Sequence, residues 1–134
     1  MIFKDFNVII EKTENLCTLL LEQEAYKELR QMIEQFTVDE ESNKQYERFV
    51  GKEQLRRQKL QQDLALTPEE YDDFNQEERA LYENSVIRKY LYARKELDHL
   101  QHLIHQYLTK TIDLGRIPRP NEIDKISRGC GSAY

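Results

Sequence analysis

A hydrophobic repeat of seven residues runs through the stretch Tyr82–Leu114 and constrains the fold more than any other feature of the sequence. The stretch predicts one unbroken helix of about 50 Å, at roughly 1.5 Å per residue. With Tyr90 at heptad position a, eight of the nine a and d positions are apolar or aromatic, whereas positions b, c and f are mostly charged or polar. Such a seam is typical of coiled-coil-like packing and needs partner helices, from this chain or from a second copy. We expect the interaction seam to comprise Val86, Tyr90, Ala93, Leu97, Leu100, Ile104 and Tyr107.

The rest of the composition favours an all-α fold with one domain. The chain has 134 residues, with only 4 glycines and 3 prolines, and 34% of its residues are charged. Long segments rich in Leu, Glu, Lys, Gln and Arg with so few helix breakers are typical of helices that each bury one stripe. We therefore predict an elongated bundle of about four to five helices over residues 1–115, with a long C-terminal helix. A flexible or extended C-terminal tail is expected over residues 116–134.

Apolar spacing and capping signals predict the other helices. Phe6–Leu21 carries one broad apolar face, and a second helical stripe follows through Tyr26, Leu29, Ile33 and Phe36. Whether the chain kinks between these two stripes stays open. The sequence Thr37-Val-Asp-Glu40 fits a capping box, which predicts a helix that starts near Val38.

Stronger signals for the starts and ends of helices follow later in the chain. In Thr67-Pro68-Glu69-Glu70, the threonine is the expected N-cap and the proline takes the first helical position, so a helix from Pro68 to about Leu81 is predicted. We expect either that Asn84 or Ser85 caps the long helix, or that the long helix and the predicted helix before it fuse into one. Gly115 is expected to end the long helix in the left-handed conformation.

Charge and hydropathy narrow the classes of partner. The net charge of −5 argues against direct binding to nucleic acid, and no apolar run approaches the 18 residues of a membrane span. We therefore expect a soluble, cytoplasmic protein. A local basic stretch, Lys52–Lys59, is interpreted as a solvated face, with a docking patch for a partner as the alternative.

No catalytic constellation stands out, so we expect no enzyme. His99, His102 and His105 recur at every third residue of the long helix, but on the side away from the seam. A solvated face is the simplest interpretation; a metal site or a pH-sensitive contact is the alternative. Glu96 and His99 match the Glu-x-x-His spacing of di-iron proteins only once, which excludes a di-iron enzyme.

The two cysteines, Cys17 and Cys130, lie far apart in the chain and form no disulfide framework. Cys17 falls on the apolar face of the first helix and is interpreted as a small buried hydrophobe. Cys130 is flanked by glycines, which leave its backbone free to wrap around a ligand or partner. An incidental thiol, a metal ligand shared between subunits and an intermolecular disulfide all stay open for Cys130.

Several short blocks together carry a resemblance to a known family. Leu16 and Leu20 precede Glu24-Ala-Tyr26, and further blocks are Phe36–Glu41, Tyr46-Glu-Arg-Phe49, Leu66–Glu70, Asn84–Tyr90 and Thr111–Gly115. With this pattern, the chain from about Ile9 to Ile117 resembles the YlbF/YmcA family of bacterial regulators of competence, sporulation and biofilm formation. Most of these positions are packing positions, so the resemblance is spread along the chain.

The resemblance implies a non-enzymatic, all-helical protein that forms dimers or mixed complexes with family relatives. In better-known members the complex is an accessory to the endoribonuclease RNase Y and influences messenger RNA processing. Some members hold iron–sulfur clusters with a cysteine-rich tail, and at most Cys130 carries over as such a ligand. Our first hypothesis is thus a self-associating regulator or adaptor without a cofactor of its own. The alternative is a metal- or redox-responsive sensor in which Cys130 shares an iron–sulfur cluster with ligands from partner chains.

Overall fold

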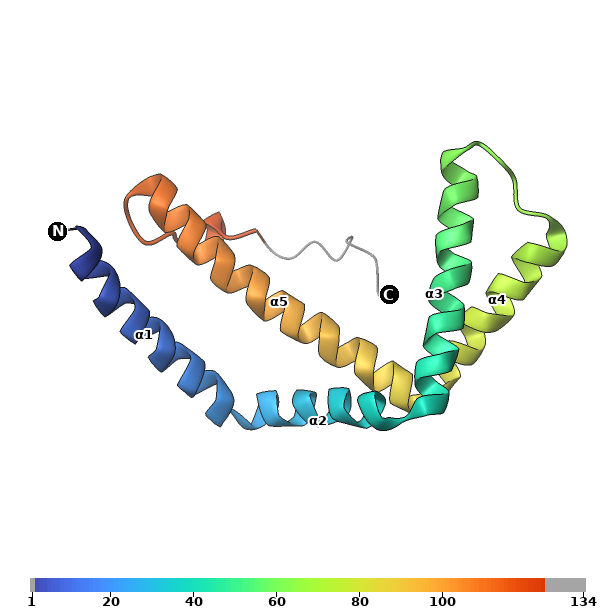
Figure 1. Cartoon of the computed structure of the whole chain (residues 1–134). Coiled ribbons are helices and arrows are strands. Elements are labelled where there is room, and N and C mark those ends of the chain that lie inside the picture. Colours follow the sequence, from blue (N-terminus) through green and yellow to red (C-terminus); the bar gives the residue numbers. More distant parts are fainter. Residues whose placement is uncertain (1, 125–134) are drawn as a thin grey trace.

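The computed structural model describes residues 2–124, and it describes side chains from Asp5 onward. Five α-helices fill most of this range, and its residues form no strand, so the all-α prediction is confirmed (Figure 1). The helices are α1 (Ile2–Glu22), α2 (Glu24–Val38), α3 (Glu40–Gln61), α4 (Pro68–Glu83) and α5 (Ser85–Leu114), followed by the short 3₁₀ helix η1 (Pro120–Glu122).

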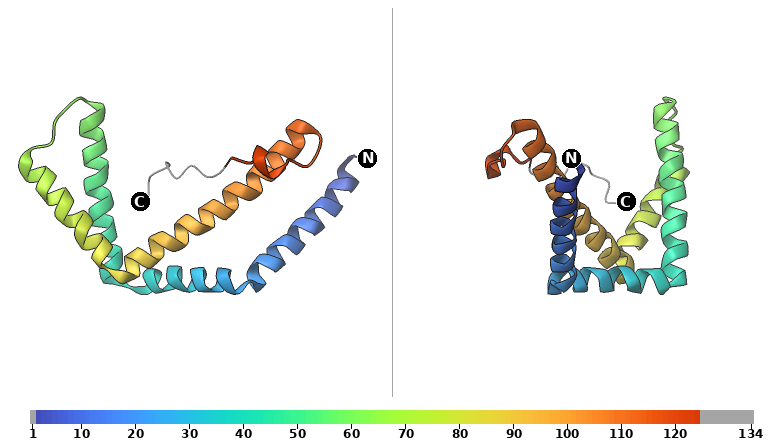
Figure 2. Two further views of the ribbon diagram at one scale, coloured as in Figure 1. Left: turned by 180° about the vertical axis from the view of Figure 1, so that it is seen from behind. Right: turned by 60° about the vertical axis from the view of Figure 1, so that its left-hand side comes forward.

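The helices form an open arrangement with two arms (Figures 1 and 2). Helix α2 lies along the base, and α1 rises from one of its ends as the first arm. At the other end, α3 and α4 form a helical hairpin, which is the second arm. Helix α5 packs on α2 and then runs out toward the free end of α1. The bend between α1 and α2, which the sequence left open, lies at Gln23, where ψ is 131° and the helix is interrupted.

The buried core lies where α2, α3, α4 and α5 meet. The aromatic rings of Phe36 and Tyr90 stack with centroids 3.9 Å apart, and Tyr46 packs edge-on against both. These rings come from three helices, so they fix the angle at which α5 leaves the junction. The largest fully buried apolar side chains of the core are Phe49, Leu81 and Ile87.

Two of the predicted caps are confirmed. Thr67 Oγ1 accepts from the backbone N–H of Glu70, and the Glu70 carboxylate accepts from the backbone N–H of Thr67, so the capping box of α4 is complete. Gly115 ends α5 with a φ of +72°, a conformation that side-chain-bearing residues avoid. Asn84 separates α4 from α5, and the long helix therefore begins at Ser85 rather than at Tyr82.

The predicted capping box at Thr37 is wrong. Thr37 belongs to α2, where its hydroxyl donates to the carbonyl of Ile33. Asp39 caps α3 instead, because its carboxylate accepts from both the N–H and the hydroxyl of Ser42. A carboxylate at the N-terminus of a helix also complements the helix dipole, so the competition between two capping residues favours Asp39.

Candidate interaction surfaces

The apolar face of α1 is uncovered. Within the described residues, α2 is the only helix whose Cα atoms come within 8 Å of those of α1. Between Asp5 and Glu22 every side chain is exposed except that of Leu20, which is half-buried. The large apolar side chains exposed on α1 are Phe6, Val8, Ile9, Ile10, Leu16, Leu19 and Leu21.

The prediction that Cys17 is buried is wrong, because Cys17 is exposed on this same face of α1. Cys17 lies on the stripe that also carries Ile10 and Leu20, so its position on an apolar face agrees with the sequence pattern. What the sequence could not show is that, among the described residues, no helix other than α2 comes close to this face.

The predicted seam of α5 divides into two halves. The near half faces α2, where Ala93 is fully buried and Tyr90 stacks on Phe36. The far half is more open: the side chain of Leu100 is 36% exposed and that of Tyr107 is 42% exposed. The structure therefore brings Val86, Tyr90 and Ala93 into the core. Farther along the seam, Leu97 and Ile104 are half-buried, and Leu100 and Tyr107 are exposed.

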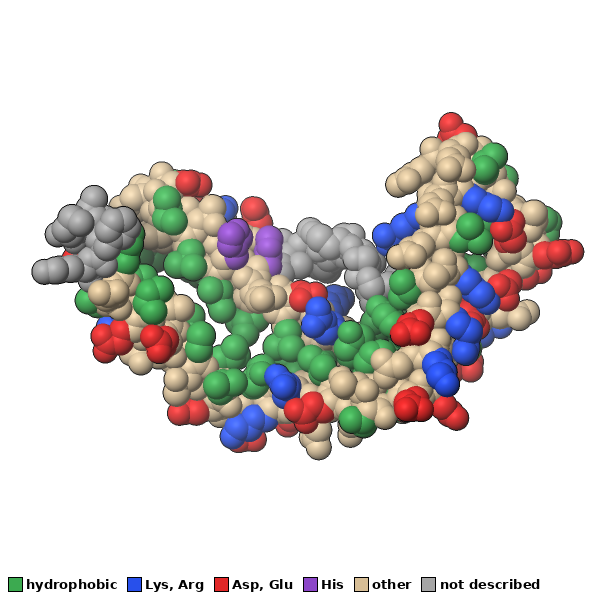
Figure 3. Space-filling model, in the orientation of Figure 1, with side chains coloured by type: hydrophobic (Ala, Val, Ile, Leu, Met, Phe, Trp, Pro, Cys, Tyr) green, Lys and Arg blue, Asp and Glu red, His purple; other side chains and the backbone are tan. Residues whose placement is uncertain are grey.

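A hollow lined by apolar side chains separates α1 from the far half of α5. In the space-filling view, hydrophobic side chains from both helices gather along this hollow, and charged groups lie mostly on its outer sides (Figure 3). Exposed apolar residues continue to the end of α5 and beyond, with Leu108 at 62%, Ile112 at 80% and Ile117 at 77%. Large exposed apolar patches are typical of sites that bind other proteins or membranes.

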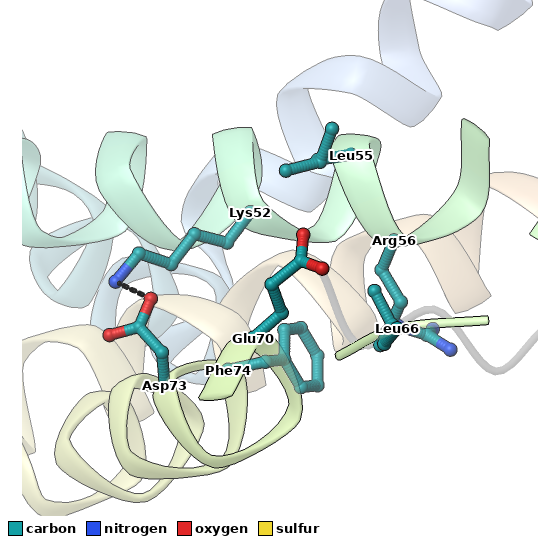
Figure 4. A pocket seen from close by; sticks show the side chains of 7 residues that line it. All are labelled: Lys52, Leu55, Arg56, Leu66, Glu70, Asp73 and Phe74. Atoms are coloured by element: carbon teal, nitrogen blue, oxygen red, sulfur yellow. Dashed lines mark ion pairs between the residues drawn. The ribbon is translucent and has the colours of Figure 1, made fainter. Parts of the chain in front are cut away.

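The basic stretch of α3 is engaged with carboxylates of the hairpin. Lys52 Nζ lies 2.7 Å from Oδ2 of Asp73 on α4 (Figure 4). Lys59 Nζ binds the carboxylate of Glu70, which also belongs to α4. Arg56 and Arg57 bind Glu53, which is buried, and the hydrogen bond from Arg56 lowers the pKa of this carboxyl group. These contacts neutralise the stretch, so it holds the hairpin together rather than offering an open basic patch.

A small cavity lies between the two hairpin helices (Figure 4). Its volume is about 60 Å³, whereas sites for drug-sized ligands measure about 300–1,000 Å³. The guanidinium of Arg56 lies 5.1 Å from the ring centroid of Phe74 and closes one side. The lining residues are Lys52, Leu55, Arg56, Leu66, Glu70, Asp73 and Phe74. We interpret the cavity as a packing gap between hairpin helices.

The segment after α5 folds back on the face opposite the seam. Gln106, which the heptad pattern places among polar outer positions, is buried because its amide pairs with the backbone of Asp124. Lys110 donates to the carbonyl of Glu122, whose carboxylate binds the guanidinium of Arg116. Sequence reasoning missed this clamp, since its partners are 18 residues apart and no local pattern links them.

The three histidines do not converge on a common point. His102 Nε2 lies 2.5 Å from Gln106 Nε2, and His105 Nε2 lies 3.4 Å from Thr109 Oγ1. Within residues 2–124, no group of three or more His, Cys, Asp or Glu side chains could hold a metal ion. Cys130, the predicted cluster ligand, lies outside the described residues. The chain has two cysteines, and an iron–sulfur cluster usually needs four, so one chain does not fit such a cluster.

Comparisons with known proteins place the chain in a family. In the described part of the chain, no helix is long and apolar enough to cross a membrane. No curated protein and no solved structure matches the chain. One family model does match, over residues 9–113, and its description is control of competence regulator ComK, YlbF/YmcA. Because this match covers most of the sequence and includes all five helices in whole or in part, the chain belongs to the YlbF/YmcA family.

Proposed function

We propose that this protein is a non-catalytic regulator of the bacterial cytoplasm that associates with itself or with family relatives and binds further partner proteins. The match to a family of competence regulators over residues 9–113 carries the proposal. The uncovered apolar faces of α1 and α5 support it, because they are suited to binding other helices rather than to holding a small substrate.

The process that we propose for this regulator is messenger RNA processing by an endoribonuclease of the RNase Y type. The protein would act as an adaptor that binds the nuclease or its accessory complex. With its net charge of −5, the chain itself is poorly suited to binding RNA, so its effect on RNA would pass through the partner.

The test is purification of the tagged full chain from its native host under anaerobic conditions, with identification of the proteins that copurify. We expect an RNase Y-type nuclease or family relatives to be enriched over an untagged control. In a deletion strain, the 5′ ends of the transcripts that the nuclease cleaves should shift. Reintroducing the wild-type gene should restore the original 5′ ends. Absence of both the enrichment and the shift would contradict the RNA-processing role.

The sensor alternative is tested on the same material. If Cys130 supplies a ligand to a shared iron–sulfur cluster, the copurified complex should show visible absorption and bound iron, and Cys130→Ala should remove both. Cys17→Ala is the matched control, because Cys17 is the other cysteine of the chain. A colourless complex, or one whose iron content is the same in the Cys130 variant, would exclude the sensor.

A further inference from the structure

The first three turns of α5 carry an open positive charge, although the net charge of the chain is −5. The stretch Ser85–Lys95 contains two arginines, two lysines and no carboxylate. These cations are Arg88, Lys89, Arg94 and Lys95, and all four residues are exposed. Within the part of the chain that the structure describes, none of them forms an ion pair.

The basic stretch of α3 is different. Each of the four cations in Lys52–Lys59 binds a carboxylate of the hairpin, so their charge is neutralised. On α5, the guanidinium of Arg88 donates to the backbone carbonyl of Tyr82 at 2.8 Å, which leaves its charge uncompensated. The cations of α5 therefore form an open basic surface, whereas those of α3 hold helices together.

The place of these cations along α5 also opposes the helix dipole. The N-terminus of a helix has a partial positive charge, so carboxylates are favourable in the first turn and cations are unfavourable there. Arg88 lies in the first turn of α5, which contains no acidic residue, and Lys89 follows directly. A bound anionic group would relieve this repulsion.

Two of the cations belong to a straight stripe on the side of α5 away from the core. Arg88, Tyr92, Lys95 and His99 recur at intervals of four, three and four residues, and we call them the outer stripe. They lie within about 60° of one another around the helix and extend over about 16 Å along it. Tyr92, in the middle, is 52% exposed. Tyrosine and arginine are among the residues that most often anchor protein interfaces.

Carboxylates border the outer stripe on both sides. Glu96 and Asp98 lie about 70° and about 90° from its centre, in opposite directions around the helix. A ligand broader than the stripe would bring negative charge against these carboxylates. RNA is such a ligand, and the net charge of −5 also repels a polyanion. A narrow ridge of carboxylates fits better, and one face of a helix presents such a ridge.

We propose that the outer stripe docks an acidic helix of a partner protein. Carboxylates of that helix would bind Arg88 and Lys95, and a side chain between them would pack on the ring of Tyr92. Residues three and four apart share one face of a helix, so an acidic ridge matches the intervals of the stripe. The stripe lies away from the apolar seam, so the two surfaces do not compete. This partner chemistry deepens the adaptor function proposed above and rests on it.

Fluorescence anisotropy on the full chain tests this docking with a labelled helical peptide of about 20 residues that carries glutamates at the intervals of the stripe. The double variant Arg88→Gln, Lys95→Gln removes the two cations. The matched control is Lys12→Gln, Arg79→Gln, because both residues are exposed and the charge change is the same. We expect the stripe variant to bind roughly tenfold more weakly than wild type, and the control to bind like wild type.

Glutamine has nearly the helix propensity of lysine and arginine, so all variants should keep their helicity, which circular dichroism checks. Raising the salt concentration from about 0.05 to 0.5 M should weaken the binding, because exposed charges are screened. Failure of the peptide to bind at about 100 µM, or equal binding by the stripe variant, would overturn the docking surface. A single-stranded RNA of about 20 nucleotides that binds more tightly than the peptide, and that loses its affinity in the stripe variant, would assign the surface to RNA instead.

Copurification from the native host separates this surface from the adaptor function itself. We expect the stripe variant to retain less of the partner proteins than wild type and the control do. Equal retention by all three proteins would leave the adaptor function standing and overturn the outer stripe as its surface. If no partner copurifies with wild type, the adaptor function fails, whereas peptide binding that depends on Arg88 and Lys95 would still support the stripe as a site for acidic helices.

Discussion

At the scale of single residues, the side chain of Asn84 connects two helices at the junction. Its Oδ1 accepts from the backbone N–H groups of Val86 and Ile87, which caps α5. Its Nδ2 donates to Ser42 Oγ and Gln45 Oε1 on α3, each at 3.0 Å. One side chain thus starts the long helix and ties it to the hairpin arm.

We predict that Asn84→Ala lowers the free energy of unfolding by about 2–3 kcal/mol, because a cap contributes about 1 kcal/mol and each lost hydrogen bond about the same. Urea denaturation at a fixed protein concentration measures the loss. Asn84→Asp is the control: it keeps the capping oxygen and should lose about half as much. Equal stability of Asn84→Ala and wild type would show that the junction does not depend on this side chain.

Gln106 likewise connects α5 to another segment, the one that follows the helix. Its Oε1 accepts from the backbone N–H of Asp124 at 2.6 Å, and its Nε2 donates to the Asp124 carbonyl. We predict that Gln106→Leu raises the exchange rate of the Asp124 amide roughly fivefold, the effect of one lost hydrogen bond of about 1 kcal/mol. The exposed Gln101 offers the control Gln101→Leu, which should leave this amide unchanged. Unchanged exchange in both variants would contradict a clamp at Gln106.

At the scale of elements, the hairpin depends on ion pairs at its open end. The hydrogen bond from Lys59, followed by that from the Thr67 backbone N–H, lowers the pKa of Glu70 to about 2. Because this pKa lies below its ordinary value of 4.5, Glu70 stabilises the folded hairpin fully above pH 4.5. That contribution is lost as the pH falls toward about 2.

We predict that the amide proton resonance of Thr67 shifts with pH with a midpoint near 2, since this amide donates to the titrating carboxylate. Glu70→Gln should abolish the shift and weaken the start of α4. Glu69→Gln is the matched control because Glu69 is the exposed neighbour of Glu70 in the same helical turn. A midpoint near the ordinary glutamate value in wild type would mean that Lys59 does not hold this carboxylate.

The elements were predictable where their signals are local. The box at Thr67 and the cap at Gly115 depend on residues within one helical turn, and the structure has both. The start of α3 was misplaced because Thr37 and Asp39 both offer a capping oxygen, and the structure uses the carboxylate of Asp39. The burial of Gln106 and the division of the α5 seam depend on contacts far apart in the sequence, which periodicity cannot reveal.

At the scale of the whole molecule, the single chain has a small core and a large open surface. Among the residues whose side chains the structure describes, core residues come from the junction of four helices, and none comes from α1. The sequence showed that long amphipathic helices were present and that they needed partners. It could not show which faces the chain covers itself, because every apolar stripe looks alike before the helices are placed. The uncovered faces are therefore the main new information in the structure.

The last prediction concerns how stability depends on concentration. If α1 folds firmly only when a second copy covers it, dilution should melt α1 while the junction of α2 to α5 stays folded. We predict that helicity, measured by circular dichroism, falls on dilution by about the 21 residues of α1, and that the Tm of wild type rises with protein concentration. Ile10→Lys, which places a charge on the apolar face of α1, should show the lower helicity at every concentration. Leu60→Lys changes an equally exposed leucine on the hairpin and should behave like wild type. A helicity and a Tm independent of concentration from about 1 to 100 µM, in a protein that sediments as a monomer, would show that α1 is stable without a second chain.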